Sequence, residues 1–415
     1  MPKMEVLTAI DIGTSKVACV IAELDAGGEL EVVSHGVSPC LGLRKGALVD
    51  PEETVRSIEE AVGEAEKQAG YPVGPVYLSL SSEYLASLPA QGVWAISNPE
   101  GEVTPQDVRR VLEAARMVGI PSDREILHIV PRGFTVDGQS GIRNPVGLSG
   151  IRLEVNAHVV AATSSFLQNM RKCVQKAGLE VENDGMVAGS IASGLAVMTE
   201  EERKLGTAMV DIGAGTVDLS VYCDGEIGHS AVLSVAGDFL THDLARFFRI
   251  PPAEAERLKL EHGVASPEFL EGDESLEATS LAGDNKVAVS RLQMAEVLEA
   301  RLLDIFEWVG KHIARAEKLG LVVTSLVITG GTAQMPGLAR MAHRELQVPC
   351  RVAAPCYPPG LMEALASPIY SNAVGLILHA AVRKHTRSES LEDDGGPSKV
   401  RVMLSRVSRW LSEVF

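Results

Sequence analysis

The sequence predicts an α/β protein with two related halves, and three observations support this prediction. Apolar runs of strand character alternate with helical patterns along the whole chain. A strand–turn–strand pattern near the N-terminus returns 200 residues later, at Val210–Val217. The chain has 415 residues, 46% of them hydrophobic, which is more than one compact core usually holds. At least two domains are therefore expected.

The first part of the chain predicts strands and one amphipathic helix. Two apolar runs, Val6–Ile12 and Val17–Leu24, flank the hairpin turn Gly13–Lys16. A helix is expected over Glu52–Ala69, because apolar residues recur there at helical spacing, and a short strand over Val76–Leu80.

Residues 85–162 predict a small α+β module inserted between two parts of the first half. Thr104 as N-cap, followed by Pro105 and Asp107, is typical of a helix start. Strands are expected around the Gly- and Pro-rich loop Gly138–Gly150, at Ile126–Val130, Gly133–Val136, Ile151–Val155 and Ala157–Ala161.

The remainder predicts a second mixed domain. Strands are expected at Ala208–Ile212, Val217–Tyr222 and Leu326–Thr329. Helices are expected at Ser165–Ala177, Val187–Met198, Gly237–Phe248, Ala253–His262, Gln293–Leu319, Pro336–Glu345 and Ser371–Val382. The acidic stretch Ala265–Ser290 is interpreted as an irregular, solvated loop.

Composition argues against several classes of protein. The chain carries 38 Lys and Arg against 55 Asp and Glu, a net charge of −17, so it repels polyphosphate backbones. Aromatic residues make up 4% and leave few stacking platforms, so no nucleic-acid partner is expected. The six cysteines lack metal-ligand spacing, and neither a signal peptide nor a spanning run is evident, so we expect a cytosolic protein.

The two copies of the strand–turn–strand pattern predict a phosphate site. Asp, Ile, Gly and Val recur in register between Ile10–Val17 and Val210–Val217. A Gly-rich turn lets backbone N–H groups approach phosphate oxygens. The carboxylates of Asp11 and Asp211 can hold Mg²⁺ through its water shell and orient an attacking water. Thr14, Ser15 and Thr216 add hydroxyl donors for the phosphates, and Lys16 adds an ammonium group.

Each turn taken alone is better explained as an ordinary hairpin, since short motifs often occur by chance. Two copies, each behind an apolar strand, favour one site between two related domains. A third glycine turn, Gly330-Gly331-Thr332, follows a strand and allows close approach of an adenosine, although alone it is a plain strand–helix turn.

These motifs carry a family resemblance. The turns Asp-Ile-Gly-Thr, Asp-Ile-Gly-Ala-Gly-Thr and Val-Ile-Thr-Gly-Gly-Thr resemble the phosphate 1, phosphate 2 and adenosine motifs of the actin/Hsp70/sugar-kinase superfamily. Within it, the chain is similar to the FtsA family of bacterial cell-division proteins, on the segments Leu127–Pro131, Gly141–Gly150, Ala255–Lys259 and Met294–Ile305. The resemblance implies a two-lobed actin-like fold, with mixed sheets flanked by helices, that holds ATP and Mg²⁺ in its cleft.

The resemblance also implies roles for individual residues. Phosphates are approached by Asp11, Gly13, Thr14, Ser15 and Lys16 from the first lobe and by Asp211, Gly213, Ala214, Gly215 and Thr216 from the second. The adenosine is faced by Gly330, Gly331 and Thr332. Glu256 and Lys259 share a helix face and either flank the adenine or form a surface ion pair. Arg291 and Arg301 are candidates for binding an acidic partner tail, or belong to an ordinary solvated helix face.

The expected division of the chain has eight segments. They are the first lobe (1–84 and 163–204), its inserted subdomain (85–162), the second lobe (205–232 and 305–385, the latter with a return helix), its upper subdomain (233–304), a flexible linker (386–398) and a terminal amphipathic helix (399–415).

The terminal segment has an apolar stripe and a basic face. Its predicted membrane residues are Val400, Arg401, Met403, Leu404, Arg406, Val407, Arg409, Trp410, Leu411, Val414 and Phe415. This pattern is typical of a helix lying in a membrane interface, and it matches the membrane-targeting tail of the FtsA family. A helix docked on the protein's own core is the alternative. The segment carries about +3, so residues 1–398 carry about −20.

The resemblance implies a scaffold at the division site. It would polymerise and would tether the acidic C-terminal tail of the tubulin-like polymer FtsZ, with other division proteins, to anionic lipid on the cytoplasmic face of the membrane. We expect ATP hydrolysis to be slow at most, because the sequence offers no obvious further base beside Asp11 and Asp211. The alternatives are a small-molecule kinase of the sugar-kinase type, which needs such a base, and an actin-like pilus-assembly adaptor.

Overall fold

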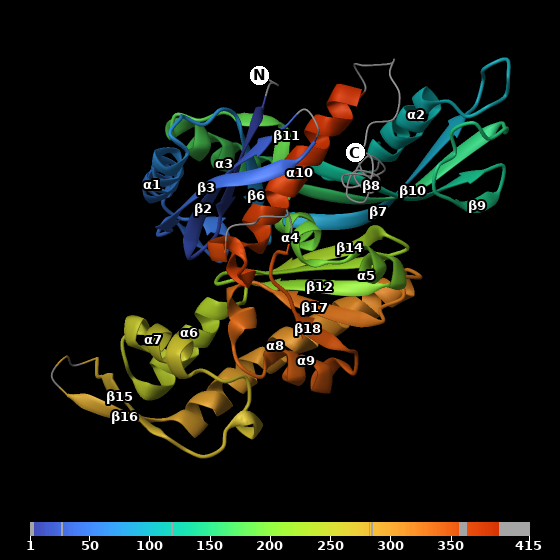
Figure 1. Ribbon diagram of the computed structural model, residues 1–415. Helices are drawn as coiled ribbons and strands as arrows, with labels where there is room; N and C mark the ends of the chain where they lie inside the picture. The colour runs from blue at the N-terminus through green and yellow to red at the C-terminus, as the bar shows by residue number, and fades with distance from the viewer. Residues whose placement is uncertain are drawn as a thin grey trace.

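The structure is a computed structural model that describes residues 4–389 except 26–27, 118, 282, 284 and 357–362. It consists of two lobes, each built on a five-stranded mixed sheet, with a four-stranded module beside the first (Figure 1). This arrangement confirms the predicted α/β fold and the inserted subdomain. The predicted terminal helix, 399–415, and most of the linker lie outside the described residues.

The sheet of the first lobe has the order β11-β6-β1-β2-β3. Its strands are β1 (Glu5–Ile12), β2 (Lys16–Leu24), β3 (Leu30–Pro39), β6 (Val76–Leu80) and β11 (Val181–Ala188). Strands β1 to β3 form an antiparallel meander, whereas β6 pairs parallel to both β1 and β11. A short hairpin, β4 (Leu43–Arg44) and β5 (Ala47–Leu48), precedes the first helix.

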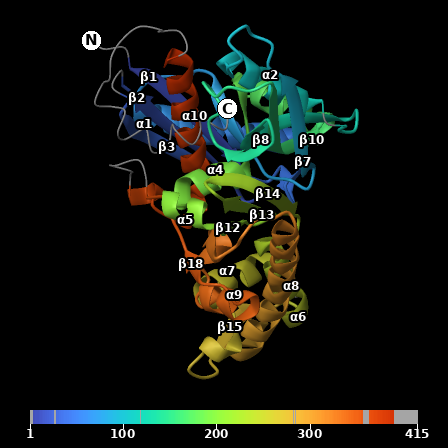
Figure 2. The ribbon, with the colours of Figure 1, turned by 90° about the vertical axis from the view of Figure 1, so that its right-hand side faces the viewer.

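Helices cover both faces of this sheet (Figures 1 and 2). One face carries α1 (Pro51–Ala69) and α3 (Ser164–Lys176), and the other carries α4 (Gly189–Val197) and α10 (Ser371–Glu389). Helix α1 begins where the Asp50 carboxylate accepts hydrogen bonds from the Glu52 and Glu53 N–H groups, at 3.0 and 3.1 Å.

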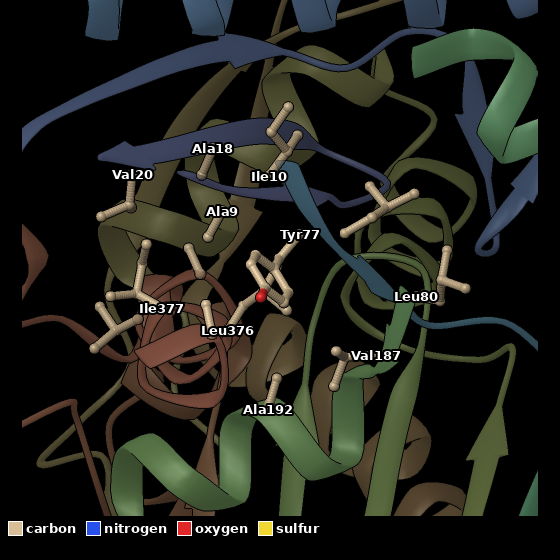
Figure 3. Close-up of a cluster of buried hydrophobic side chains, with 14 of the residues drawn as sticks. Ala9, Ile10, Ala18, Val20, Tyr77, Leu80, Val187, Ala192, Leu376 and Ile377 are labelled. Atoms are coloured by element: carbon tan, nitrogen blue, oxygen red, sulfur yellow. The ribbon is translucent and has the colours of Figure 1, made fainter. Parts of the chain in front are cut away.

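Helices α4 and α10 belong to the core of the first lobe. Figure 3 shows Ala192 of α4 and Leu376 and Ile377 of α10 facing Ala9 and Tyr77 of the sheet. Helix α10 follows the second lobe in the chain and packs back on the first. The two helices therefore connect the lobes.

The inserted module is a sheet of order β7-β10-β8-β9 covered by one helix. Its elements are β7 (Leu85–Ala95), α2 (Pro105–Arg116), β8 (Arg124–Val136), β9 (Gln139–Ile142) and β10 (Arg152–Thr163). Helix α2 begins with the predicted cap, in which Thr104 and Asp107 bond each other's backbone reciprocally. Strands β8 and β10 are each continuous where the sequence predicted two strands, because bulges interrupt the pairing without ending either strand.

The second lobe has the sheet order β14-β13-β12-β17-β18. The strands are β12 (Thr207–Ile212), β13 (Val217–Cys223), β14 (Glu226–Leu233), β17 (Ser325–Thr329) and β18 (Cys350–Val352). Its helices are α5 (Glu200–Leu205), α6 (Gly237–Phe248), α7 (Pro252–His262), α8 (Arg291–Lys318) and α9 (Leu338–Leu346). Among the described residues, no helix combines the length and apolar character needed to cross a membrane.

The inserted module lies against the second lobe through strand β14. Ser87 Oγ donates to the Ser230 carbonyl at 2.6 Å, and His158 Nε2 lies 2.9 Å from Ser230 Oγ. Farther along the module, Arg143 donates to the Asp224 carbonyl at 2.9 Å. The module therefore contacts both lobes.

Three sequence predictions about elements were wrong. The helix predicted from Val187 begins at Gly189, because residues 187–188 are the end of strand β11. A buried strand and a buried helix are both continuously apolar, so hydrophobic periodicity does not show where one ends and the other begins. The stretch predicted as an irregular loop, 265–290, contains the hairpin β15 (Ser275–Thr279) and β16 (Lys286–Ser290). Helix α10 continues to Glu389, four residues into the predicted linker.

Candidate functional site

The two predicted phosphate turns have the same backbone closure. Gly13 N–H donates to the Lys16 carbonyl at 2.9 Å, and Gly213 N–H donates to the Thr216 carbonyl at 2.9 Å. Each turn joins the first two antiparallel strands of its lobe. The repeat seen in the sequence is thus a repeat of structure.

The two turns meet between the lobes. A Cβ added to Gly215 would lie 2.1 Å from Thr14 Oγ1, so only glycine leaves room for the opposite turn. A cavity of about 760 Å³ opens at this junction, within the usual range for a small-molecule site. Its lining includes every residue predicted to bind a cofactor or metal: Asp11, Gly13, Thr14, Ser15, Lys16, Asp211, Gly213, Ala214, Gly215, Thr216, Glu256, Lys259, Gly330, Gly331 and Thr332.

The two predicted metal-side aspartates each lie one residue before the end of their strand, β1 or β12. Burial raises the pKa of Asp11, although the nearby Lys16 ammonium opposes the shift. Burial also raises the pKa of Asp211 to about 6, against a hydrogen bond from Ser193. Asp211 is held through its Oδ2, which lies 2.5 Å from Ser193 Oγ and 3.2 Å from Asn372 Nδ2.

A third carboxylate, Asp218, also lines the cavity and was missed by the sequence analysis. It lies on β13, two residues beyond Thr216, and its Oδ2 accepts a hydrogen bond from Ser81 of the first lobe. Its Oδ1 is buried and has no hydrogen-bond partner among the residues that the structure describes. Burial and the Asp211 carboxylate raise the pKa of Asp218 to about 8. Side chains two residues apart on a strand lie on the same face, so the position of Thr216 could have predicted that Asp218 also faces the site.

Lys16 spans the cavity toward the start of the return helix. Its Nζ donates to the Ile369 carbonyl and lies 4.5 Å from the centroid of the Tyr370 ring. Burial lowers the pKa of the Lys16 ammonium, while the Asp11 and Asp211 carboxylates oppose this shift. Neither Ile369 nor Tyr370 was predicted to contribute to the site.

The third glycine turn closes the cavity floor. Gly330 has φ 91°, and a Cβ there would lie 2.3 Å from Asp211 Oδ1. Thr332 Oγ1 donates to the Gly213 carbonyl at 3.1 Å, which joins this turn to the second phosphate turn. A short 3-10 helix, Gly331–Gln334, follows it directly, and helix α9 begins only at Leu338.

Glu256 and Lys259 face the cavity from helix α7. Lys259 Nζ lies 2.7 Å from Glu256 Oε2, and it also donates to Thr241 Oγ1 at 2.8 Å and to the Gly237 carbonyl at 3.2 Å. Thr241 Oγ1 in turn donates to Glu256. The pair is therefore part of a network that joins α6 to α7 at the wall of the cavity.

Arg291 and Arg301, the predicted partner-binding residues, do not line the cavity. Arg291 begins helix α8, donates to the His262 carbonyl at 3.1 Å and lies 3.5 Å from Glu274 Oε2. Arg301 lies 2.8 Å from Asp243 Oδ2 and 2.9 Å from Asp304 Oδ2. Both guanidinium groups thus have carboxylate partners within the chain.

The donor set suits Mg²⁺ held through water. In the part of the chain that the structure describes, no three His, Cys, Asp or Glu side chains come close enough to ligate one ion directly. Asp11, Asp211 and Asp218 nevertheless line one cavity. Asp218 Oδ1, which has no hydrogen-bond partner among the described residues, could accept a hydrogen bond from a metal-bound water. Mg²⁺ usually keeps several waters and takes one or two carboxylates plus substrate phosphates, so these residues fit it.

Comparison with known proteins decides the family. A family model described as "Cell division protein FtsA" matches residues 208–375, and one described as "SHS2 domain inserted in FTSA" matches residues 82–161. Cell division protein FtsA of Pseudomonas aeruginosa is 36% identical over 415 residues, covering 99% of this chain and 98% of the relative. The chain belongs to the FtsA family. FtsA of Bacillus subtilis is 33% identical over 380 residues, covering 92% of this chain and 84% of the relative.

Solved structures of other proteins share the fold of this FtsA-family chain. A chain of the PilM–PilN type IV pilus biogenesis complex superposes with a TM-score of 0.64 at 18% identity, covering 90% of this chain and 98% of that one. MreB 5 of Spiroplasma citri bound to AMPPNP superposes with a TM-score of 0.55 at 13% identity, covering 94% and 100%. At these identities the likeness establishes an actin-like fold and nothing further.

Proposed function

We propose that this FtsA-family protein is an ATP- and Mg²⁺-binding scaffold that polymerises and tethers the division ring to the cytoplasmic membrane. The cavity between the two phosphate turns carries the proposal, because it collects glycine backbone, hydroxyl groups, the ammonium groups of Lys16 and Lys259, and carboxylates from both lobes. Glycine turns next to Lys16 suit a polyphosphate chain, because the backbone of such a turn allows close approach of phosphate oxygens. The structure of an MreB protein of this fold with AMPPNP is consistent with a nucleotide here.

Within this site, residues of the chain divide into three groups. The two turns and Lys16 would contact the phosphates, Asp11 and Asp211 would hold Mg²⁺ through its waters, and the Glu256–Lys259 pair with Gly330–Thr332 would surround the adenosine. When bound, Mg²⁺ would neutralise charge on the phosphates. Asp218 accepts a hydrogen bond from Ser81, and we propose that it orders solvent in the cavity. We also propose that ATP turnover is slow at most.

We propose that the basic segment 399–415 attaches the protein to anionic lipid. It carries Lys399, Arg401, Arg406 and Arg409 against Glu413, and each cation near an anionic surface contributes about 1 kcal/mol. One such helix binds weakly and reversibly, so a filament that presents many of them would attach firmly through avidity. Sedimentation with phosphatidylglycerol and with phosphatidylcholine vesicles distinguishes attachment to anionic lipid from docking of the segment on the protein itself. Attachment through charge attraction requires the anionic lipid, whereas a docked segment gives no sedimentation with either kind of vesicle.

We further propose that the upper part of the second lobe, residues 233–304, receives the acidic C-terminal tail of FtsZ. Arg291 and Arg301 remain the candidates, and a partner carboxylate would exchange with Glu274 at the first or with Asp243 at the second. Arg301→Glu should weaken binding of an FtsZ tail peptide in a fluorescence titration. Unchanged affinity in both Arg291→Glu and Arg301→Glu would contradict this placement.

The eight-segment division of the chain is part of the same proposal. The lobe cores hold the nucleotide together with Glu256 and Lys259, residues 85–162 and 233–304 make protein contacts, and the rest of the predicted linker, 390–398, connects the terminal helix. The sugar-kinase alternative is disfavoured because the relatives with 33–36% identity are named as cell division proteins. The pilus-adaptor alternative rests on a likeness of fold alone.

Phosphate release in the presence of ATP and Mg²⁺, measured for the wild type and Asp211→Ala, tests the proposal. We expect ATP binding with slow turnover in the wild type, and turnover reduced further in the variant. Fast turnover, or acceleration by a small polyol, would favour a phosphotransferase instead. Absence of ATP binding by the wild type would overturn the assignment of the cavity.

A further inference from the structure

The Asp211 carboxylate of the second lobe is held by two side chains of helices that pack on the first lobe. Ser193 belongs to α4 and is fully buried, and Asn372 belongs to the first turn of α10 and lines the cavity. Asp211 Oδ2 lies 2.5 Å from Ser193 Oγ and 3.2 Å from Asn372 Nδ2, and Ser193 Oγ lies 3.0 Å from Asn372 Oδ1. Ser193 Oγ and Asn372 Nδ2 therefore both donate to the same oxygen of Asp211.

Close packing fixes the two helices that present these two donors. A Cβ added to Gly375 of α10 would lie 1.7 Å from the Ala192 carbonyl oxygen of α4, so the backbones touch where any side chain would separate them. A Cβ added to Gly189 would lie 3.1 Å from Asn372 Oδ1. Figure 3 shows Ala192 beside Leu376 and Ile377 in the same apolar cluster. Ser193 and Asn372 thus have little freedom to move apart.

The other carboxylate oxygen of Asp211 is also confined. A Cβ on Gly330 would come within 2.3 Å of Asp211 Oδ1, so that oxygen lies directly against the backbone of the adenosine turn. One oxygen is thus fixed by hydrogen bonds and the other by a close backbone, which sets the plane of the carboxylate. A carboxylate that orients metal-bound water needs such support from its neighbours.

We propose that Ser193 and Asn372 are positioning residues that hold the Asp211 carboxylate in the orientation required for Mg²⁺-dependent nucleotide binding. This inference rests on the proposed function of the cavity. Because both donors lie on α4 and α10, the orientation of Asp211 depends on the helices that connect the lobes. Helix α10 continues from this contact to Glu389, ten residues before the basic terminal segment begins at Lys399.

The test measures how much Mg²⁺ strengthens ADP binding, as the ratio of the ADP dissociation constants in EDTA and in excess MgCl₂. We expect Ser193→Ala and Asn372→Asp to lower this ratio about tenfold, as loss of an outer partner of a metal site usually does. Asn372→Asp keeps the shape of the side chain and replaces the donating amide with an acceptor. Ser190→Ala is the matched control, since Ser190 is buried on the same helix and does not contact Asp211.

The outcomes separate the two claims. A purely structural role would lower the urea midpoint and weaken ADP binding equally with and without Mg²⁺, and this unchanged ratio would overturn the inference. Wild-type protein that fails to bind ADP would instead overturn the proposed function of the cavity. A ratio that falls in both variants and stays at the wild-type value in Ser190→Ala is the result we expect.

Discussion

The ammonium group of Lys16 lies 4.5 Å from the ring centroid of Tyr370, although the two residues belong to opposite ends of the chain. Lys16 comes from the first phosphate turn, and Tyr370 immediately precedes the return helix α10. The contact places a cation at the wall of the cavity with an aromatic face and the Ile369 carbonyl as its neighbours. A bound polyphosphate would offer this cation stronger, charged acceptors.

Lys16→Met is therefore expected to weaken ATP binding by about 10- to 100-fold, because a charge-assisted contact to phosphate is lost. Isothermal titration calorimetry measures the change. Lys45→Met is the matched control, since Lys45 also lies over an aromatic ring, that of Phe239 at 4.6 Å, but does not line the cavity. Equal affinities in Lys16→Met and wild type would contradict the placement of phosphates at this turn.

Gly330 provides a test of the third glycine turn, Gly330–Thr332, which we propose lies beside the adenosine. Gly330→Ala should destabilise the protein by more than about 2 kcal/mol and abolish ATP binding, because the new Cβ collides with Asp211 and the Ile212 carbonyl. Gly320→Ala has a comparable positive φ, 80°, but open space around it, so it should cost only about 1–2 kcal/mol and leave ATP binding intact. Urea denaturation and ATP titration report the two effects. Equal losses of stability and equal ATP affinities in the two variants would show that the chain accommodates a Cβ at Gly330, which would contradict the prediction.

The Glu256–Lys259 pair should distinguish nucleoside from bare phosphate. Glu256→Gln is expected to weaken ATP binding about fivefold, the usual effect of one lost polar contact, and to leave binding of inorganic tripolyphosphate unchanged. Glu254→Gln is the control on the same helix, because Glu254 pairs with Arg257 at 3.1 Å and does not line the cavity. An equal loss of affinity for tripolyphosphate would place the pair at the phosphates.

His158 should make the folded state sensitive to acid. Burial lowers its pKa to about 3, from an ordinary value of 6.5, so the unfolded chain binds more protons between these values and stability falls as the pH drops through that window. Between pH 7 and pH 5 we expect the wild type to lose about 2 kcal/mol more than His158→Gln does. Urea titrations at both pH values measure this, with the exposed His343 as control in His343→Gln. Superimposable pH dependences of wild type and His158→Gln would refute it.

Local patterns predicted the strands and turns that form the site. The turn residues Gly13 and Gly213 follow apolar strands, and that order alone predicted hairpins with the aspartates at the strand ends. The pattern in 275–290 was missed because Leu276, Ala278, Val287 and Val289 alternate with charged and small residues in an acidic stretch. Strand β11 was missed because its buried end continues directly into an apolar helix.

Partners from distant segments could not be predicted. Ser81, Ser193 and Asn372 have no motif around them, and they reach Asp211 or Asp218 only because the lobes pack together. Asp218 was within reach of prediction, since it lies two residues beyond Thr216 on the same strand. Its burial and raised pKa depend on the opposite lobe, which no local pattern describes.

Co-sedimentation with phosphatidylglycerol-containing vesicles tests the central claim, that a nucleotide site between the lobes acts together with a basic terminal segment at a membrane. The full chain and a chain ending at Glu389 are compared with and without ATP and Mg²⁺, and ATP binding is measured for both. We expect the full chain to sediment, more completely with ATP, and the shortened chain to stay in solution while it binds ATP equally well. Equal sedimentation of the two chains would contradict the account.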